Sequence, residues 1–356
     1  MTGSYDRRLT VIIPTWNRVR LLERCLSSLA SQRVRCPVLV VDNGSTDSTR
    51  EMLETRFPEV EALALEENQG FARAVNRGIL HCSTDYVALL NNDTEADPGW
   101  VEAGLAALER NPSYWFLASR MVDFRRRDLI DSAGDGYDRT GMPFKRGRGD
   151  ARQLHNYSRP VLGASAGAAF YRRRLFDRIG LFDETYYMYL EDVELSLRAQ
   201  FTGHPCLYVP EAVVYHIEAA SDPSREDLVA DLLAPAEEES RHVLPVEKDA
   251  GVRPIPPRPD PPPLPVCYSP ARVYWITRNR WQLMVTYQPG RNLLQLAYGW
   301  GRSTAFHALK AGYLGSFLRG LAAGMARTPQ ALAKRWLVRR DRVLTGREIC
   351  RLMNGS

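Results

Sequence analysis

Short apolar runs alternate with segments of helical periodicity over the first hundred residues. Four runs rich in Val, Ile and Leu have the length of buried strands. They cover residues 9–13, 38–41, 60–65 and 86–90. Helical segments separate them. Apolar positions from Val19 to Leu29 recur every three or four residues, a polar turn after Val41 begins a second helix, and residues 71–80 form a third. The alternation predicts a parallel, doubly wound α/β sheet, whose ligands bind beyond the carboxyl ends of its strands.

The pattern is weaker between residues 111 and 165. Residues 125–152 are rich in Gly, Arg and Asp, which favours an exposed or mobile loop. A regular pattern returns afterwards, with a small and apolar segment, a helix, and two short strands that lead to His216. These are residues 163–171, 190–201, 206–209 and 212–215.

The composition changes at about residue 218, where an acidic stretch begins that runs to Asp249. Residues 254–265 are mostly proline, which is typical of a polyproline II spacer. We therefore predict three parts: an α/β domain over residues 1–220, a mostly disordered insertion over 221–268, and a helical, basic region over 269–356.

The net charge of +5 is unevenly distributed. Residues 222–250 contain nine acidic and three basic residues, which leaves +11 on the rest of the chain. A basic body suits an anionic partner such as a nucleotide, a lipid phosphate or a membrane surface, although a merely solvated surface would look the same. No nucleic-acid partner is expected.

The six cysteines have no C-x-x-C spacing, which argues against a structural zinc site and a disulfide framework. The N-terminus lacks the apolar core of a signal peptide, and no uncharged apolar run reaches the roughly 18 residues of a spanning helix. We expect a cytoplasmic protein, with a peripheral role at the membrane left open.

Two acidic sites carry the candidate chemistry. Asp93 follows an apolar run, and a carboxylate at a strand end can hold a divalent cation against a phosphate, although Asn-Asn-Asp is also ordinary turn chemistry. Glu191, Asp192 and Glu194 share one helical turn. Their mutual repulsion would raise a pKa and suit a general base, unless they are simply a favourable acidic first turn. His216 is either a metal ligand or a structural histidine. Together these residues suggest group transfer from a phosphate-activated donor.

Polar loops follow the first strands, at residues 14–18 and 42–47. Their Asp and Asn side chains can accept hydrogen bonds from a nucleoside, and the helix starts favour phosphate, although turn chemistry alone explains each loop. Gly70 permits a tight turn before a helix on which Arg73 and Asn76 share a face, either toward the ligand or toward solvent. Neither G-x-G-x-x-G nor a P-loop signature is present.

In this order and spacing the motifs resemble family 2 glycosyltransferases of the GT-A fold, and more closely their bacterial rhamnosyltransferase-like branch. The resemblance covers residues 9–218 and, more loosely, 274–280. The motifs that carry it are Val11–Arg18, Val41–Asp47, Asn68–Phe71, Asn76–Gly78, Leu90–Asp93, Ile179–Glu184, Glu191–Leu195, Arg198, Gly203 and His216.

The resemblance implies a role for each matching residue. Asp93 and His216 would hold Mg²⁺ or Mn²⁺ against the donor diphosphate. Asp192 would be the general base for inverting attack by an acceptor hydroxyl, assisted by Glu191. The residues that would bind the nucleotide-sugar donor are Pro14, Thr15, Asn17, Asp42, Asn43, Asn68, Gly70, Asn76 and Asn92. Two positions depart from the family pattern: Asn91 replaces the first Asp of the metal motif, which weakens metal binding, and Glu194 replaces a more usual Asp.

The resulting expectation is an inverting, metal-dependent glycosyltransferase with a C-terminal helical extension. dTDP-rhamnose is the favoured donor and a UDP-sugar the next. The acceptor would be a hydroxyl of a glycan or lipid-linked saccharide of the cell envelope, or else a specialised metabolite. The C-terminal segment would lie at the inner membrane face or pack on the catalytic domain. Two rivals are a catalytically silent binding module and a sugar-phosphate nucleotidyltransferase. The latter would need a Gly-rich basic loop, which residues 14–18 do not supply.

Overall fold

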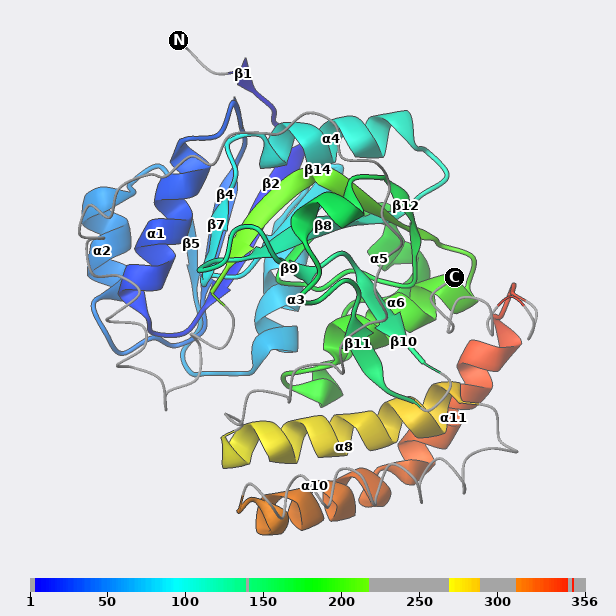
Figure 1. The fold of residues 1–356 in the computed structure, drawn as a ribbon. Coiled ribbons are helices and arrows are strands. Elements are labelled where there is room, and N and C mark those ends of the chain that lie inside the picture. The colour runs from blue at the N-terminus through cyan, green and yellow to red at the C-terminus, as the bar shows by residue number, and fades with distance from the viewer. Residues whose placement is uncertain (1–3, 139–140, 218–268, 289–311, 345–347, 349–356) are drawn as a thin grey trace.

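The computed structural model of the 356-residue chain describes residues 4–138, 141–217, 269–288, 312–344 and 348. Within these residues ten strands form one sheet with the order β12-β14-β8-β13-β6-β2-β4-β5, to which β7 adds beside β14 and β9 beside β8. Figure 1 shows this sheet with helices on both faces. The insertion that we predict over residues 221–268 lies outside the residues that the structure describes.

The first half of the sheet is parallel, as its sequence pattern predicts. Strand β2 pairs with β4 and β6, and β4 pairs with β5, all in parallel. The connecting helices alternate with these strands. The strands are β2 (Leu9–Thr15), β4 (Val38–Asp42), β5 (Glu61–Ala64) and β6 (Tyr86–Leu90), and the helices are α1 (Val19–Ala30), α2 (Thr49–Arg56) and α3 (Phe71–His81).

Alternate residues of the strands face two separate cores. In β2, Val11 and Ile13 pack with α1, α2 and α4 (Trp100–Arg110), whereas Ile12 packs with α3, α5 (Arg174–Ile179) and α6 (Glu191–Phe201). Strands buried on both faces read as continuous apolar runs, which is why the four strands of this half are easily recognised in the sequence.

The second half of the sheet is mixed, so the prediction of a parallel sheet holds only for the first half. Strand β13 (Ala168–Arg172) runs antiparallel to β6 and to β8 (Phe116–Asp123). Residues 206–216 form one strand, β14 (Cys206–His216), rather than two, and its register shifts between Val209 and Val213. Pro210 lies at this shift, where it has no N–H to donate to the ladder. Four other short strands are β1 (Ser4–Tyr5), β3 (Val34–Arg35), β7 (Thr94–Ala96) and β12 (Arg159–Val161).

The prediction of an exposed or mobile loop at residues 125–152 is wrong for much of that stretch. It contains β9 (Ile130–Ser132), β10 (Asp135–Tyr137) and β11 (Pro143–Lys145), and β10 pairs with β11. Asp131 and Asp135 are buried there. Their polar side chains give the sequence the composition of a loop, although both lie inside the protein. The 3₁₀ helix η1 (Arg152–His155) follows.

Three helices follow the catalytic fold in sequence: α8 (Pro270–Tyr287), α10 (Leu314–Ala326) and α11 (Thr328–Arg340). In Figure 1 they lie together on the side of α6 and the β10–β11 hairpin. Leu283 and Tyr287 of α8 and Val338 of α11 share a core with Val193 and Leu197 of α6. The predicted C-terminal helical extension is therefore present, and α6 is packed between it and the sheet.

Candidate active site

The residues predicted to bind a donor gather along the carboxyl edge of the parallel strands. Thr15 ends β2 opposite Asp42, which ends β4. The amide of Asn92, just after β6, donates to Thr15 Oγ1 at 2.9 Å, and the backbone N–H of Asn43 donates to the Thr15 carbonyl at 2.8 Å. Pro14 is buried within β2. Neighbouring parallel strands thus bring together residues that are far apart in the sequence, as the topology predicts.

Two loops at this edge are joined by side-chain hydrogen bonds. Asn17 has a left-handed backbone (φ 57°), its N–H donates to Ser45 Oγ, and its side-chain oxygen accepts from the Thr46 N–H at 2.8 Å. Asp42 is buried and accepts from the Ser45 N–H and from Arg50 Nε, the latter at 2.8 Å. Both sides of the predicted nucleoside site are therefore preformed.

The loop before α3 is fixed by Asn43. Its amide donates to Asn68 Oδ1 at 3.0 Å and to the Gly70 carbonyl at 3.2 Å. Gly70 has a φ of +85°, and a Cβ at this position would lie 2.5 Å from the Tyr187 ring. Only glycine can therefore occupy this position without moving Tyr187.

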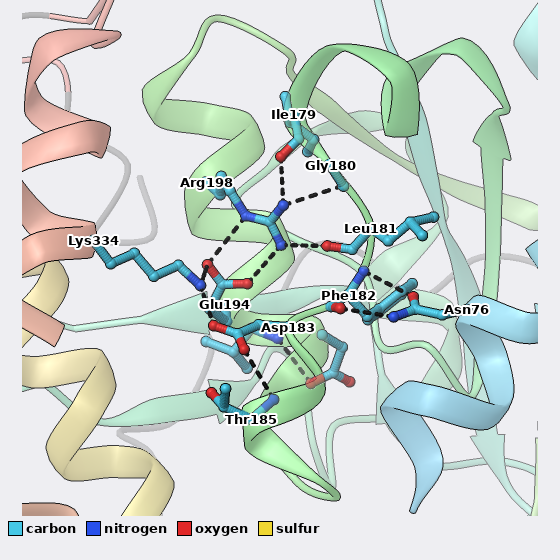
Figure 2. A network of polar contacts seen from close by, with 12 residues as sticks. Asn76, Ile179, Gly180, Leu181, Phe182, Asp183, Thr185, Glu194, Arg198 and Lys334 are labelled. Carbon is cyan, nitrogen blue, oxygen red and sulfur yellow. Dashed lines mark hydrogen bonds and ion pairs between the residues drawn. The ribbon is translucent and has the colours of Figure 1, made fainter. Parts of the chain in front are cut away.

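Asn76 lies deeper in the protein and holds a different segment. Its amide donates to the Phe182 carbonyl at 2.9 Å and to Glu184, and its oxygen accepts from the Phe182 N–H (Figure 2). These contacts join α3 to the segment that leads to α6. A direct contact between Asn76 and the donor stays a prediction.

Asp93 and His216 meet where β7 and β14 pair. His216 Nε2 lies 3.5 Å from Asp93 Oδ1, and His216 Nδ1 lies 2.8 Å from Asp131 Oδ2. Asp131 in turn accepts from Lys145 Nζ at 2.8 and 2.9 Å. Asp131 therefore orients the imidazole so that Nε2 faces Asp93, which is how carboxylates commonly support a metal-binding histidine.

The residues here fit a divalent cation. Asp93 Oδ1 is buried and accepts no hydrogen bond, and the buried Asn91 Oδ1 also lacks a partner. Burial lowers the pKa of His216, but Asp93 and Asp131 outweigh it and raise this pKa to about 10, so a cation that binds here must displace the Nε2 proton. The described part of the chain has no group of three or more His, Cys, Asp or Glu residues in metal-binding geometry. Protein ligands would thus be few, as is usual where substrate phosphates complete the shell of Mg²⁺.

Glu191 and Asp192 begin α6, and the pKa of each is raised, mainly by burial. Asp192 accepts from the backbone N–H groups of Ala166 at 3.2 Å and Val193 at 2.8 Å. Glu191 Oε2 is buried without a hydrogen-bond partner. Burial of Asp192 outweighs Lys145, which lowers its pKa, and an acid with a raised pKa can accept a proton near neutral pH.

Glu194 behaves in the opposite way, so the predicted repulsion holds for Glu191, whose pKa is raised by burial and then by Asp192, but does not extend to Glu194. Burial alone would raise the pKa of Glu194, but Arg198 and Lys334 outweigh it and lower this pKa to about 2. Figure 2 shows Glu194 between Arg198 of α6 and Lys334 of α11. Arg198 also donates to the carbonyls of Ile179, Gly180 and Leu181.

The segment before β13 connects the two acidic sites. The N–H of Asn91 donates to the Gly167 carbonyl at 3.0 Å, and the adjacent residue Ala166 donates to Asp192. Asp135, on β10, has its pKa raised to about 8 by burial and by Asp192, with a further contribution from Asp131. Asp135 thus interacts electrostatically both with the predicted base and with Asp131, which contacts His216.

The sequence pattern did not identify Asp131, Asp135 and Lys145 as residues of the site. All three lie in the stretch that its composition assigned to a loop. The small residues Ser132, Ala133 and Gly134 between the two acids are the one local signal of close packing.

A family model for glycosyl transferase family 2 matches residues 10–180. N-acetylglucosaminyl-diphospho-decaprenol L-rhamnosyltransferase of Mycobacterium tuberculosis (strain ATCC 25618 / H37Rv) is 33% identical over 239 residues, which cover 60% of this chain and 77% of that protein. The chain belongs to glycosyltransferase family 2. Within it, the protein is rhamnosyltransferase-like.

Two further proteins are similar to this family 2 glycosyltransferase. Validoxylamine A glucosyltransferase of Streptomyces hygroscopicus subsp. jinggangensis (strain 5008) is 29% identical over 262 residues, which cover 65% of this chain and 60% of that protein. A crystal structure of GalNAc-T7 with UDP, GalNAc and Mn²⁺ superposes with a TM-score of 0.50 at 16% identity and covers 59% of this chain and 44% of that chain. The second likeness concerns the fold, which is GT-A as predicted.

Proposed function

We propose that this glycosyltransferase is an inverting, metal-dependent enzyme that transfers rhamnose from dTDP-rhamnose to a hydroxyl of a lipid-linked saccharide in cell-envelope synthesis. The observation that carries the proposal is the buried pair of Asp93 and His216, whose Oδ1 and Nε2 lie 3.5 Å apart at the carboxyl edge of the sheet. The rhamnosyltransferase relative, whose name states a polyprenyl diphosphate acceptor, supports the choice of sugar and acceptor.

Each group has a step in this reaction. Asp192 accepts the proton of the attacking hydroxyl, whose oxygen forms the new bond to the anomeric carbon as the bond to the diphosphate breaks. Inversion follows because attack and departure occur on opposite faces. Asp93 and His216 would hold Mg²⁺ or Mn²⁺, which stabilises charge on the departing diphosphate. The loops at Thr15, Asn17 and Asp42 would bind the nucleoside, and those at Asn43, Asn68, Gly70 and Asn92 would line the donor side.

The first test is calorimetric titration of dTDP, UDP and GDP, each with and without Mn²⁺. We expect dTDP to bind with Mn²⁺ and at least tenfold more weakly without it, since roughly 1.4 kcal/mol of ion-mediated contact gives that factor. Asp93→Asn and His216→Ala should remove the Mn²⁺ dependence while leaving the metal-free affinity unchanged. Arg8→Ala, an exposed position on another part of the chain, is the matched control.

Preference for UDP would move the donor to a UDP-sugar, and the validoxylamine relative makes a specialised metabolite the second candidate acceptor. If the folded protein binds none of the three nucleotides, the proposed donor site is wrong and a silent binding module of the same fold becomes the better reading.

A peripheral membrane position would suit a lipid-linked acceptor. Within the described residues no helix is both long and apolar enough to cross a membrane. Exposed apolar side chains nevertheless lie on α10 and α11 among basic ones, Trp336 being 62% exposed. We expect the double variant Leu332→Ser and Trp336→Ser to float less with anionic vesicles than the wild type. Leu80→Ser, at an exposed position on α3, is the control. Unchanged flotation of the double variant would contradict this placement.

A further inference from the structure

The segment just before the proposed base has a strained backbone. It joins the 3₁₀ helix η2 (Glu184–Tyr186) to α6 and therefore sets the direction in which the first turn of α6 begins. Tyr187, Tyr189 and Leu190 have φ values of 62°, 66° and 68°. Residues with a side chain adopt these left-handed angles at a cost, and three in four positions persist only where the surroundings hold them.

Helix α8 holds this segment in its strained conformation. The side-chain amide of Asn279 donates to the carbonyls of Tyr186, Met188 and Tyr189 at 2.9, 2.9 and 2.8 Å. Asn279 is fully buried. One side chain thus bonds three carbonyls; because its amide nitrogen has two N–H groups, one N–H is shared, and the Tyr186 carbonyl also accepts from the Met188 N–H. An aliphatic residue in its place would leave the Met188 and Tyr189 carbonyls without this donor.

Arg278 fixes the orientation of this amide. Its Nη1 donates to Asn279 Oδ1 at 2.8 Å, which leaves the amide nitrogen facing the segment. Its Nη2 donates to the Thr185 carbonyl at 2.6 Å. Two consecutive residues of α8 therefore bind four backbone carbonyls between residues 185 and 189.

The same segment contacts the proposed donor site on its other side. The Tyr187 ring stacks on Trp275 of α8, with centroids 4.7 Å apart, and packs against Gly70. The Tyr187 carbonyl accepts from the Ala72 N–H at 3.2 Å. A movement of this segment would thus act on Asp192 and on the loop before α3.

We infer that Asn279, oriented by Arg278, is a positioning residue for catalysis: it holds residues 185–190 in the strained conformation that places Asp192. This inference rests on the proposed role of Asp192 as the base. It assigns to α8 a part in the chemistry, although α8 lies more than fifty residues beyond the end of β14.

The test compares Asn279→Ala with Thr286→Val in the full chain. Thr286 is also buried on α8, but its hydroxyl donates to the Ala331 carbonyl of α11 and does not touch the segment. We expect backbone hydrogen exchange over residues 186–194 to accelerate in Asn279→Ala only. With dTDP-rhamnose and N-acetylglucosaminyl-diphospho-decaprenol, kcat should fall about 10- to 100-fold in Asn279→Ala, because a misplaced base of this kind costs up to about 10² in rate. The KM for dTDP-rhamnose should change much less than kcat, since Asn43 still holds Asn68 and Gly70 of the loop before α3 when Asn279 is replaced.

A rescue variant separates positioning from a general loss of packing. Adding Tyr189→Gly to Asn279→Ala should restore part of kcat, because glycine adopts a positive φ without strain. Unchanged exchange in Asn279→Ala, faster exchange with unchanged kcat, or an equal fall of kcat in Thr286→Val would each overturn the inference. If the wild type transfers nothing from dTDP-rhamnose, the proposed donor is wrong, and the exchange measurement by itself decides whether Asn279 holds the segment.

Discussion

Asp192 and Glu194 lie two residues apart on α6, and their surroundings differ. Glu194 faces the C-terminal helices: Lys334 of α11, Tyr287 of α8 and Arg198 of α6 contact its two oxygens at 2.6 to 3.2 Å. Asp192 faces the sheet edge and accepts hydrogen bonds from two backbone N–H groups. The pKa of Glu194 is lowered and that of Asp192 raised. In the described part of the chain these contacts, more than the crowding of acids, set the two pKa values apart, and the raised one suits the proposed proton transfer.

The variant Asp192→Asn tests this difference between the two acids most directly. Removing a general base costs roughly 10²- to 10⁴-fold in kcat, so transfer should nearly vanish. The unfolding midpoint should change little, because the removal of a buried charge offsets the loss of one accepted hydrogen bond: the amide nitrogen of Asn cannot accept from the Ala166 or Val193 N–H. Initial rates and thermal melts measure both quantities, and undiminished turnover would remove the assignment of Asp192 as the base.

Glu194→Gln should give the reverse result, a large loss of stability with little change in kcat. It leaves the buried Arg198 without its carboxylate, and breaking a buried ion pair costs about 3–5 kcal/mol of unfolding free energy. The pKa of Glu194 is lowered to about 2, so its contribution is present above about pH 4.5 and is lost as the pH falls toward 2. Urea unfolding at pH 7 and pH 3 should show a large difference between variant and wild type at the first pH and a smaller one at the second. Equal stability at pH 7 would contradict the network.

Tyr287→Phe tests the smaller neutral contribution to the same network. The Tyr287 hydroxyl donates to Glu194 Oε1 at 2.6 Å, and a hydrogen bond to a charged group contributes about 1.5–3 kcal/mol. We expect a loss of that size in unfolding free energy and a kcat close to that of the wild type below the melting temperature. A large fall in kcat with unchanged stability would mean that this face of α6 also takes part in catalysis.

Asp135→Asn tests the raised pKa near Asp192. Burial, followed by Asp192, raises the pKa of Asp135 to about 8. Its protonated form is favoured in the folded state, so this contribution is present below about pH 4 and is lost as the pH rises through 8. The wild type should therefore lose at most about 4 kcal/mol more than Asp135→Asn between pH 5 and pH 8, because each pH unit in this range costs about 1.4 kcal/mol and coupling to neighbouring acids reduces the total. Parallel urea curves at the two pH values would contradict the placement of Asp135.

The parallel half of the sheet and the helix that carries Glu191 and Asp192 follow from the sequence. Their apolar runs and periodicities are local, and burial on both faces makes the strands apolar throughout. The order of the polar motifs then places Thr15, Asp42 and Asn92 at one edge, since parallel neighbouring strands end on the same side. The ends of the four strands and of two helices in this half were predicted within two residues, as for β4 (Val38–Asp42) and α3 (Phe71–His81), whereas no end was predicted for α2.

Tertiary structure decided which acid is neutralised and which is left to react. Glu194 is paired by Lys334, 140 positions further along the chain, and the strained turn before Asp192 is held by Asn279 from α8. Asp131 supports His216 from a stretch whose composition is that of a loop. Hydrophobic periodicity reports how each segment buries its own apolar face, whereas the partners of a buried charge come from whichever segments pack against it. The pairing of these charges is therefore a property of the packed molecule, and the local pattern along the chain does not contain it.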